Sequence, residues 1–340
     1  MFRRKPKEED TEEERSIKLK GRSLDEKKER RKPWRKKERY AVLLLFCGTA
    51  ILSFVLALVA RRGKLPGLPK LDSAGLGLSE TVVLTKNQVP DSRAEKQKQI
   101  ISEFKDVTSK LSGVYALAVV DLSTGDTFGV NQFETMQAAS LMKLPVMSLL
   151  LKNASEGKVN LDTVYALRSS DKIGGSGSLY SKPNGTEYKY KELLEYMGKQ
   201  SDNTAFNVIR HKLTDEAVSD FMQKVGMTHT NIKQNSTTPT DMALLLRKLY
   251  EGRVIPVAYR DMLFNSITDT IYEDHLVAGL PENIRVSHKY GREVHVVNDA
   301  GVVFAPKPYV VVIMTDGVVE SEADKIFPKL SEIVYSGEAR

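Results

Sequence analysis

The chain has a single cysteine, Cys47, among its 340 residues. One thiol cannot form a disulfide within the chain, a four-cysteine zinc site or a Cys-x-x-Cys redox motif. No internal repeat is visible either. The sequence therefore predicts no disulfide framework, and it implies neither a metal nor an organic cofactor.

Beyond residue 39 the chain has no excess of positive charge. Residues 1–39 hold 17 basic and 10 acidic side chains and account for the whole formal net charge of +7. The remaining 301 residues carry 34 charges of each sign. A nucleic-acid-binding domain would carry its basic excess on a folded face. The charge distribution therefore argues against a nucleic-acid partner.

Residues 40–60, YAVLLLFCGTAILSFVLALVA, contain no charged side chain. A helix of this length, rising about 1.5 Å per residue, spans the roughly 30 Å hydrocarbon core of a bilayer. A cleaved signal peptide is the main alternative, but Arg61 and Arg62 directly after the segment disfavour cleavage. Eleven of the 20 residues before the segment are basic, against four of the 20 after it. We therefore predict an uncleaved, single-pass anchor in the cell membrane, with a cytoplasmic N-terminus and an extracytoplasmic catalytic domain.

The regions on either side of this segment differ in composition. Residues 1–39 have almost no apolar side chains, which predicts a disordered cytoplasmic tail. Residues 61–91 are rich in proline and glycine without a lasting period, which predicts a stalk. A single folded domain is expected over residues 92–340.

The pattern of residues 92–340 predicts an α+β domain. An amphipathic helix is expected at 92–113, followed by two strands joined by a turn within 114–131. Helices are expected at 140–157, 191–197, 204–213, 215–225 and 239–251, and a last one at 321–335; further strands are expected within 283–291, 294–305 and 308–317. Since the strands lie at both ends of the domain, we predict one antiparallel five-stranded sheet flanked by helices, with a mainly helical subdomain.

The first chemical motif is the pair Ser140 and Lys143. Residues i and i+3 share one face of a helix, so a lysine amine at this spacing can act as the base for a serine hydroxyl. The same spacing recurs at Ser102, Ser155 and Ser169, but those serines lie in polar stretches. Ser140 opens an apolar helix and is therefore the candidate nucleophile.

Two further motifs follow along the chain. Ser201-Asp202-Asn203 stands 61 residues after Ser140 and would also serve as a helix N-cap. In 288–291, His-Lys-Tyr-Gly, Lys289 beside Gly291 is suited to line a cleft, because glycine lets a substrate approach the backbone. A solvent-facing lysine on an edge strand is the alternative interpretation.

In this order the three motifs resemble the S-x-x-K, S-D-N and K-T-G elements of the serine β-lactamase and penicillin-binding protein superfamily. The resemblance is strongest to the class A β-lactamase-like domain and covers residues 92–338. It implies that Ser140 is the acylated nucleophile, Lys143 its base partner and Ser201 a proton-relay hydroxyl.

The resemblance also implies a set of substrate contacts. Asn203 would bind the substrate amide, and Lys289 would face the substrate carboxylate, with Tyr290 and Gly291 beside it. The backbone N–H groups of Ser140 and Arg292 would form the oxyanion hole.

Two departures from the family pattern stand out. The segment between Gly226 and Thr237 is only MTHTNIKQNS, which contains no Asp or Glu, whereas the family has a longer loop bearing a glutamate that activates the deacylating water. A general base typically contributes 10²- to 10⁴-fold, so we expect slow deacylation. His229 is the candidate substitute within the loop.

The second departure is Tyr290, which stands where the family has threonine or serine. A phenol in that position could enter the space that the ligand would use and could alter specificity or impair binding.

These observations leave three hypotheses. The first is a membrane-anchored serine hydrolase that opens β-lactams slowly through a Ser140 acyl-enzyme. The second is a carboxypeptidase or transpeptidase acting on the D-Ala-D-Ala stem peptides of peptidoglycan, since such enzymes work without the loop glutamate. The third is a catalytically impaired binding module of the same fold, suggested by Tyr290 and the missing base.

Overall fold

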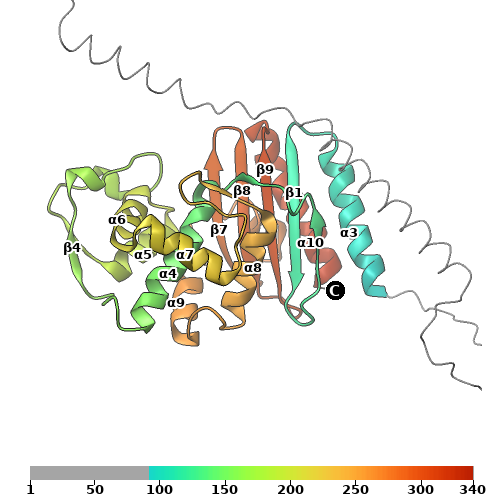
Figure 1. The fold of residues 1–340 in the computed structure, drawn as a ribbon. Helices are drawn as coiled ribbons and strands as arrows, with labels where there is room; N and C mark the ends of the chain where they lie inside the picture. The colour runs from blue at the N-terminus through green and yellow to red at the C-terminus, as the bar shows by residue number, and fades with distance from the viewer. Residues whose placement is uncertain (1–91, 340) are drawn as a thin grey trace, which may run out of the picture. The chain divides into compact units, whose positions relative to one another are not determined.

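The computed structural model describes residues 92–339 (Figure 1). The predicted tail, anchor and stalk lie outside the described residues. Within 92–339, no helix is both long enough and apolar enough to cross a bilayer.

A five-stranded antiparallel sheet forms the centre of the domain, as predicted, with the strand order β2-β1-β9-β8-β7. The strands are β1 (Val114–Asp121), β2 (Thr127–Val130), β7 (Val286–Glu293), β8 (Val296–Val303) and β9 (Tyr309–Asp316). β1 pairs with β9 from Val114 opposite Asp316 to Asp121 opposite Tyr309. The two ends of the domain therefore share the sheet, and β7 forms one of its edges.

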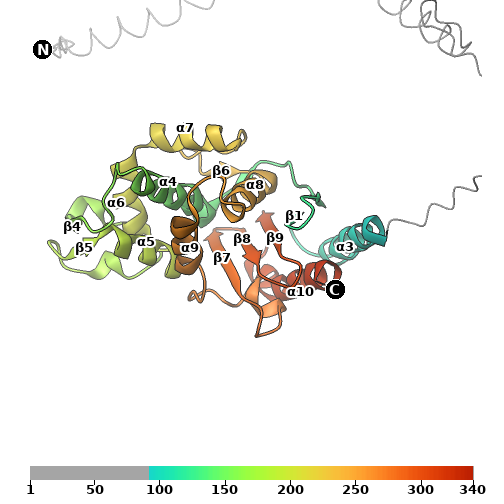
Figure 2. The same cartoon turned by 90° about the horizontal axis from the view of Figure 1, so that it is seen from below.

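Both faces of the sheet are buried, because successive side chains of a strand point to opposite faces. On β1, Ala116 and Ala118 belong to one core cluster, whereas Leu117 and Val119 belong to the other. The first cluster includes residues of α8 (Pro239–Tyr250), and the second includes residues of α3 (Ser92–Thr108) and α10 (Glu320–Glu338). Figure 2 shows α8 on one side of the sheet and α3 with α10 on the other.

The mainly helical subdomain lies beyond the β7 edge of the sheet (Figure 1). Its helices are α4 (Lys143–Ser155), α5 (Tyr190–Lys199), α6 (Asn203–Leu213), α7 (Asp215–Val225) and α9 (Val257–Ser266). Two small sheets pair β3 (Met136–Gln137) with β6 (Ser236–Thr237), and β4 (Val164–Ala166) with β5 (Glu187–Lys189). Short 3₁₀ turns are η1 (Ala139–Met142), η2 (Ser169–Asp171), η3 (Leu179–Ser181) and η4 (Val277–Gly279).

Most predicted helices are confirmed within a few residues. α7 covers 215–225 as predicted, with Thr214 at its N-cap and Gly226 in a left-handed conformation at its end. The N-capping threonine of α8 is Thr238, whose hydroxyl accepts a 3.1 Å hydrogen bond from the Asp241 amide. The first helix ends at Thr108, five residues earlier than predicted.

The prediction of one α-helix beginning at Ser140 was wrong. Ser140 lies in η1, and the α-helix α4 begins at Lys143. Ala139 has φ 49°, which keeps the chain out of the right-handed helical region just before the serine. Pro145 lies in the first turn of α4, where a missing N–H costs nothing, and this fits a helix start at Lys143.

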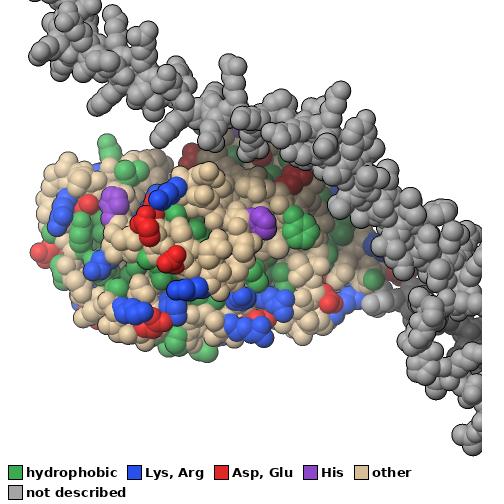
Figure 3. Space-filling model, viewed as in Figure 1, with side chains coloured by type: hydrophobic (Ala, Val, Ile, Leu, Met, Phe, Trp, Pro, Cys, Tyr) green, Lys and Arg blue, Asp and Glu red, His purple; other side chains and the backbone are tan. Residues whose placement is uncertain are grey.

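The surface seen in Figure 3 carries basic and acidic side chains interspersed with one another. Several basic side chains lie along the lower edge of that face, with acidic side chains among them. This arrangement agrees with the balanced charge of the chain beyond residue 39.

Candidate active site

The turn that carries Ser140 is held between the sheet and the loop 227–236. The Asn298 side chain on β8 donates a 2.8 Å hydrogen bond to the Gln137 carbonyl. The Ala138 amide donates one of 2.8 Å to the Asn235 carbonyl. These bonds fix the backbone on the N-terminal side of Ser140, so the serine projects from a rigid turn.

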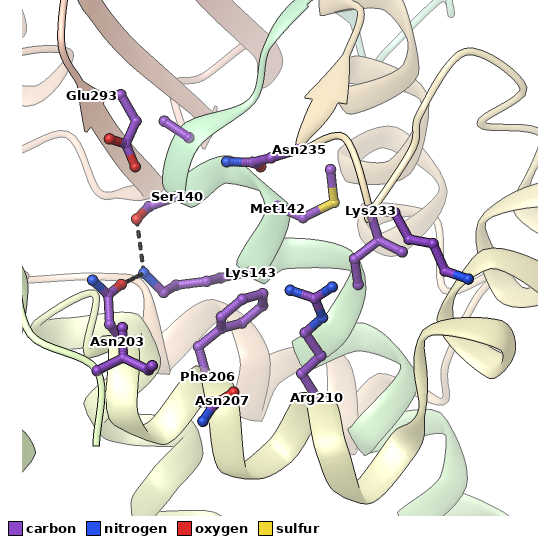
Figure 4. Close-up of a pocket in the computed structure, with 13 residues that line it drawn as sticks. Ser140, Met142, Lys143, Asn203, Phe206, Asn207, Arg210, Lys233, Asn235 and Glu293 are labelled. Carbon is purple, nitrogen blue, oxygen red and sulfur yellow. Dashed lines mark hydrogen bonds between the residues drawn. The ribbon is translucent and has the colours of Figure 1, made fainter. Parts of the chain in front are cut away.

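Lys143 connects the first two sequence motifs. Its amine Nζ lies 2.7 Å from Ser140 Oγ, 3.1 Å from Ser201 Oγ and 2.8 Å from Asn203 Oδ1 (Figure 4). An ammonium has three N–H donors, so these three oxygens satisfy its protonated form completely. When the amine is neutral, its lone pair can accept the Ser140 hydroxyl proton instead. The geometry therefore suits the Lys143 amine both for holding a proton and for acting as a base.

Burial shifts the pKa of the Lys143 amine. Lys143 is only 2% exposed. Removal from water lowers the pKa of Lys143 to about 7, although the negative charges of Asp202 and Glu293 raise it in part. An amine with this pKa exchanges protons near neutral pH, as a general base requires.

The segment Ser201-Asp202-Asn203 both caps a helix and contacts Lys143. Asp202 is the N-cap of α6, where its carboxylate accepts 2.8 Å hydrogen bonds from the amides of Ala205 and Leu179. Ser201 has φ 52°, a left-handed conformation that is unusual for serine. The cap fixes the start of α6, and the residues on either side of Asp202 turn their side chains to Lys143.

The third motif lies on β7 beside the nucleophile. A Cβ atom at Gly291 would lie 2.9 Å from the Ser140 amide nitrogen, so only glycine lets the strand pass this closely. Lys289 and Glu293 share this face of the strand, because strand side chains alternate. Strand β7 therefore passes directly beside the Ser140 turn at Gly291.

Lys289 is almost completely buried, with an exposed fraction of 1%, and it is not among the residues that line the cavity described below. Its amine donates a 2.7 Å hydrogen bond to the Tyr290 carbonyl. Burial lowers the pKa of Lys289 well below its usual range, and the nearby Lys143 charge lowers it further, while Asp299 raises it.

Tyr290 faces the opposite side of the strand. Its ring stacks on Tyr272 at a centroid distance of 4.9 Å and lies 4.4 Å from the His275 ring, within the core cluster shared with α3 and α10. It does not line the cavity beside Ser140. The concern that the phenol occupies ligand space is therefore wrong, and the period-2 alternation of strand side chains is the physical reason.

The Arg292 side chain also turns away from the site, forming ion pairs with Glu320 and Asp324. The backbone amide of Arg292, in contrast to its side chain, points to the open edge of β7. The His288 amide points away from β8 and bonds to the Ile267 carbonyl at 2.8 Å. By the alternation of an antiparallel strand, the Arg292 amide, four residues on, points to the same open edge. This orientation suits an oxyanion-hole donor.

A buried charge network lies behind the motif. His288 is fully buried, with its Nδ1 2.8 Å from an Asp299 carboxylate oxygen and its Nε2 3.3 Å from a Glu273 oxygen. Burial alone lowers the pKa of His288, but the two carboxylates outweigh it and raise the pKa to about 9. This histidine is therefore a buried cation at neutral pH.

The loop 227–236 brings no carboxylate to the site. The nearest acid in sequence, Asp241, serves the loop backbone instead: it accepts 2.8 Å hydrogen bonds from the His229 amide and the Thr230 hydroxyl. The His229 side chain is 66% exposed and is not among the cavity-lining residues. His229, the candidate substitute for the loop base, is therefore an exposed side chain outside the cavity.

A cavity of about 320 Å³ opens beside Ser140 and Lys143 (Figure 4). Its walls include three charged residues that the sequence analysis did not single out: Arg210, Lys233 and Glu293. Glu293 could have been found by counting two residues on from Gly291 along the strand face. Arg210 lies seven residues after Asn203, on the same face of α6. No periodicity in the sequence pointed to Lys233.

Within residues 92–339 no group of three or more histidine, cysteine, aspartate or glutamate residues is arranged to hold a metal ion. The groups gathered around Ser140 instead suit nucleophilic attack by a hydroxyl with an amine as base.

Residues 97–337 match the family model described as "Beta-lactamase enzyme family". The chain belongs to this family. Its relatives in the beta-lactamase enzyme family act as serine hydrolases through an acyl-enzyme, and this chain shares that class of mechanism.

Individual relatives in the beta-lactamase enzyme family are distant. Beta-lactamase VEB-1 of Pseudomonas aeruginosa is 22% identical over 254 residues, which cover 67% of this chain and 85% of that protein. The solved structure of PBP-A is 28% identical with a TM-score of 0.66, covering 71% of this chain and 95% of the other. A beta-lactamase from Sphaerobacter thermophilus has a TM-score of 0.67 at 24% identity, covering 71% and 97%. The α+β fold is thus that of this family.

Proposed function

We propose that this protein is a membrane-anchored serine hydrolase that forms an acyl-enzyme at Ser140 and hydrolyses β-lactam amide bonds slowly. The observation that carries the proposal is the convergence of the Lys143 amine on the Ser140 hydroxyl, the Ser201 hydroxyl and the Asn203 amide oxygen. The relatives named as beta-lactamases support the choice of β-lactams.

In the acylation step, the neutral Lys143 amine takes the hydroxyl proton of Ser140 while Oγ attacks the amide carbonyl carbon. The oxyanion that forms is stabilised by the backbone N–H groups of Ser140 and Arg292. When the carbon–nitrogen bond breaks, the proton held by Lys143 passes through the Ser201 hydroxyl to the leaving nitrogen. The proton taken from the serine is thus returned to the leaving group.

Two side chains orient the substrate in this proposal. Asn203 binds the acyl amide next to the reacting carbonyl, and Lys289 attracts the carboxylate of the leaving group. Burial lowers the pKa of Lys289, and a substrate carboxylate beside the amine would favour its charged form.

Deacylation is the slow step. The loop 227–236 supplies no acid to activate water, and Glu293, the acidic residue that lines the cavity, lies on the β7 side of Ser140. Water attack without a base in the loop position is slower by about 10²- to 10⁴-fold. The acyl adduct is therefore long-lived.

The test is labelling of the full chain, purified in detergent, with a fluorescent penicillin, followed by intact mass spectrometry over time. We expect a Ser140-dependent adduct that decays slowly, and none in a Ser140→Ala variant. Absence of any Ser140-dependent adduct with several acyl donors would refute the proposal. Insertion of a longer, glutamate-bearing loop before Thr237 should speed decay of the adduct.

A second candidate is a D-Ala-D-Ala carboxypeptidase or transpeptidase acting on peptidoglycan stem peptides. The observation that favours it is the cavity beside Ser140, which is large enough for a peptide side chain. One relative, a point mutant of PBP-A, was solved as an acyl-enzyme complex with penicillin G. Release of D-alanine from a D-Ala-D-Ala peptide, with a penicillin adduct that does not decay, would favour this candidate.

The impaired binding module loses one of its two motivations, because the Tyr290 ring is packed in the core. The missing loop base remains compatible with it. A Ser140-dependent adduct that forms at a measurable rate would exclude this reading.

The membrane anchor at residues 40–60 is part of the proposal and rests on the charge-free segment and its basic flank. Protease added to intact cells should digest the domain and spare residues 1–39. Protection of the domain would refute the orientation.

A further inference from the structure

The cavity beside Ser140 runs along one face of α6. Asn203, Phe206, Asn207 and Arg210 all line it, and their spacing of three, four and seven residues places them on one side of the helix. From Asn203 to Arg210 this face extends about 10 Å at 1.5 Å per residue. The cavity therefore continues from the acylation site well past the reacting bond.

The walls of the cavity change in character along this line. Met142, Phe206 and Ile232 give the cavity an apolar wall, and Figure 4 shows Phe206 between Lys143 and Arg210. At the far end they carry the cations Arg210 and Lys233. Arg210 Cζ lies 5.8 Å from the centroid of the Phe206 ring, and Lys143 Nζ lies 5.6 Å from the same centroid. One ring thus separates the base from the distal cation.

The cavity stays open because the short loop closes on itself. Asn231 pairs with Ser236, and the Asn231 side chain accepts hydrogen bonds from the amides of Lys233 and Gln234 at 2.9 and 3.1 Å. Asp241 holds the preceding residues through the His229 amide. The loop 227–236 is therefore held by hydrogen bonds within itself and to Asp241, and the cavity beside it is preformed.

Both distal cations retain the capacity to bind an anion. Asp215 engages Nε and Nη2 of Arg210 at 2.6 and 2.7 Å, which leaves Nη1 on the other edge of the guanidinium. Lys233 lies 3.3 Å from Glu216, and both side chains are largely exposed, so this ion pair is weak. Neither acid lines the cavity.

The opposite end of the site carries the opposite charge. Glu293 is the acidic residue among those lining the cavity, and Figure 4 shows it on the other side of Ser140 from Arg210 and Lys233. An anionic group on a substrate is repelled at one end and attracted at the other. The charges thus select the direction in which an acyl side chain lies.

We propose that this cavity is a subsite for the acyl side chain of the substrate and that it selects donors in which an apolar segment is followed by a carboxylate. The proposal rests on the proposed acylation of Ser140 and names the substrate class. The carboxylate binds Arg210 and Lys233, and the apolar segment packs on Phe206. Such a carboxylate can belong to a β-lactam side chain or to an acidic residue of a peptide donor.

The test compares donors that differ only in the terminal group. 6-Aminopenicillanic acid acylated with an adipoyl chain is matched with its adipamoyl analogue, which ends in an uncharged amide. Peptides ending in D-Ala-D-Ala, with glutamate or glutamine upstream, form the second arm. We measure the second-order acylation rate constant of the full chain in detergent for each pair, at low and high salt.

We expect the carboxylate donor to react about tenfold faster or more, a change of about 1.4 kcal/mol, because the carboxylate gains charge-assisted hydrogen bonds that the amide lacks. Lys233→Gln and Arg210→Gln should each lower the carboxylate-to-amide ratio toward one, and high salt should do the same. Lys212→Gln, an exposed position on α6, controls for loss of a charge and should leave the ratio unchanged. A preference in only one arm identifies the source of the carboxylate.

Equal rates for the two members of each pair would overturn the subsite, as would a preference that both cavity variants retain. If no donor labels Ser140, the proposed function fails, and the subsite is then judged by binding of the same pairs to the Ser140→Ala variant by calorimetry. A binding preference lost in Lys233→Gln would still support the subsite, and equal affinities would refute it. The two failures are thus distinguishable.

Discussion

The pH dependence of acylation tests the role of Lys143 directly. Burial lowers the pKa of Lys143 from 10.5 to about 7. At pH 7, about half of such amines are neutral, against about 0.03% of amines with the ordinary lysine value. The shift therefore multiplies the population of the base by about 10³. Acylation should fall about tenfold per pH unit below 7 and level off above pH 8.

The assay is stopped-flow acylation of the full chain by a fluorescent penicillin between pH 5.5 and 9. The acylation rate constant and the dissociation constant of the first complex are fitted separately, because titration of Lys289 affects carboxylate binding whereas titration of Lys143 affects chemistry. Lys143→Arg keeps the charge but has no lone pair at these pH values. This variant should lose about 10²- to 10⁴-fold in acylation.

A rate constant that stays level from pH 6 to pH 9 would refute the reasoning. So would an inflection above pH 9, because Lys143 would then be a permanent cation in the free enzyme. Lys143→Arg acylating at the wild-type rate would exclude the amine as base.

Three further predictions concern neighbouring groups. Glu293→Gln should move the ascending limb of the acylation profile to lower pH, because the Glu293 charge raises the pKa of Lys143; an unmoved limb would contradict this. Gly291→Ala should slow acylation at least tenfold by pushing strand β7 away from the Ser140 turn, with most of the stability retained in urea unfolding; an unchanged rate would show that the strand and the turn can separate without cost to acylation. His288→Phe should cost about 3–5 kcal/mol at pH 6 by leaving Asp299 buried without its cation. The wild-type stabilisation is complete below pH 6.5 and is lost as pH rises through about 9, so the cost should shrink at pH 9.5 in urea unfolding.

Much of the fold was predictable because its signals are local. The limits of α7 follow from Thr214 and Gly226, and the five strands follow from apolar runs that both faces bury. The two-residue pair of β3 and β6 was not predictable, since so short a strand has no period. α9 was missed because only Leu263, Phe264 and Ser266 of its residues are buried, which gives no regular apolar stripe.

The residues of the site were also predictable only where a local pattern marks them. Ser140, Lys143, Ser201 and Asn203 carry a motif, and the structure brings their side chains together. The direction of Tyr290 was available from strand alternation. The role of Asp241 was not, because it depends on how the loop 227–236 folds back on α8. Packing between distant segments decides such contacts, and no local pattern records them.

The loop 227–236 is a place where the length of this protein can change during evolution. Lys143 and Asn203 lie on the helices α4 and α6, whereas Lys233 and Gln234 lie in an exposed turn closed by Asn231. Insertions between the exposed Lys233 and Gln234 should leave the core packing of Ile232 in place, as surface insertions usually do. Selection on the length of this turn can therefore change the lifetime of the acyl adduct while Ser140 and Lys143 stay in place, provided that the hydrogen bond from the Ala138 amide to the Asn235 carbonyl is kept.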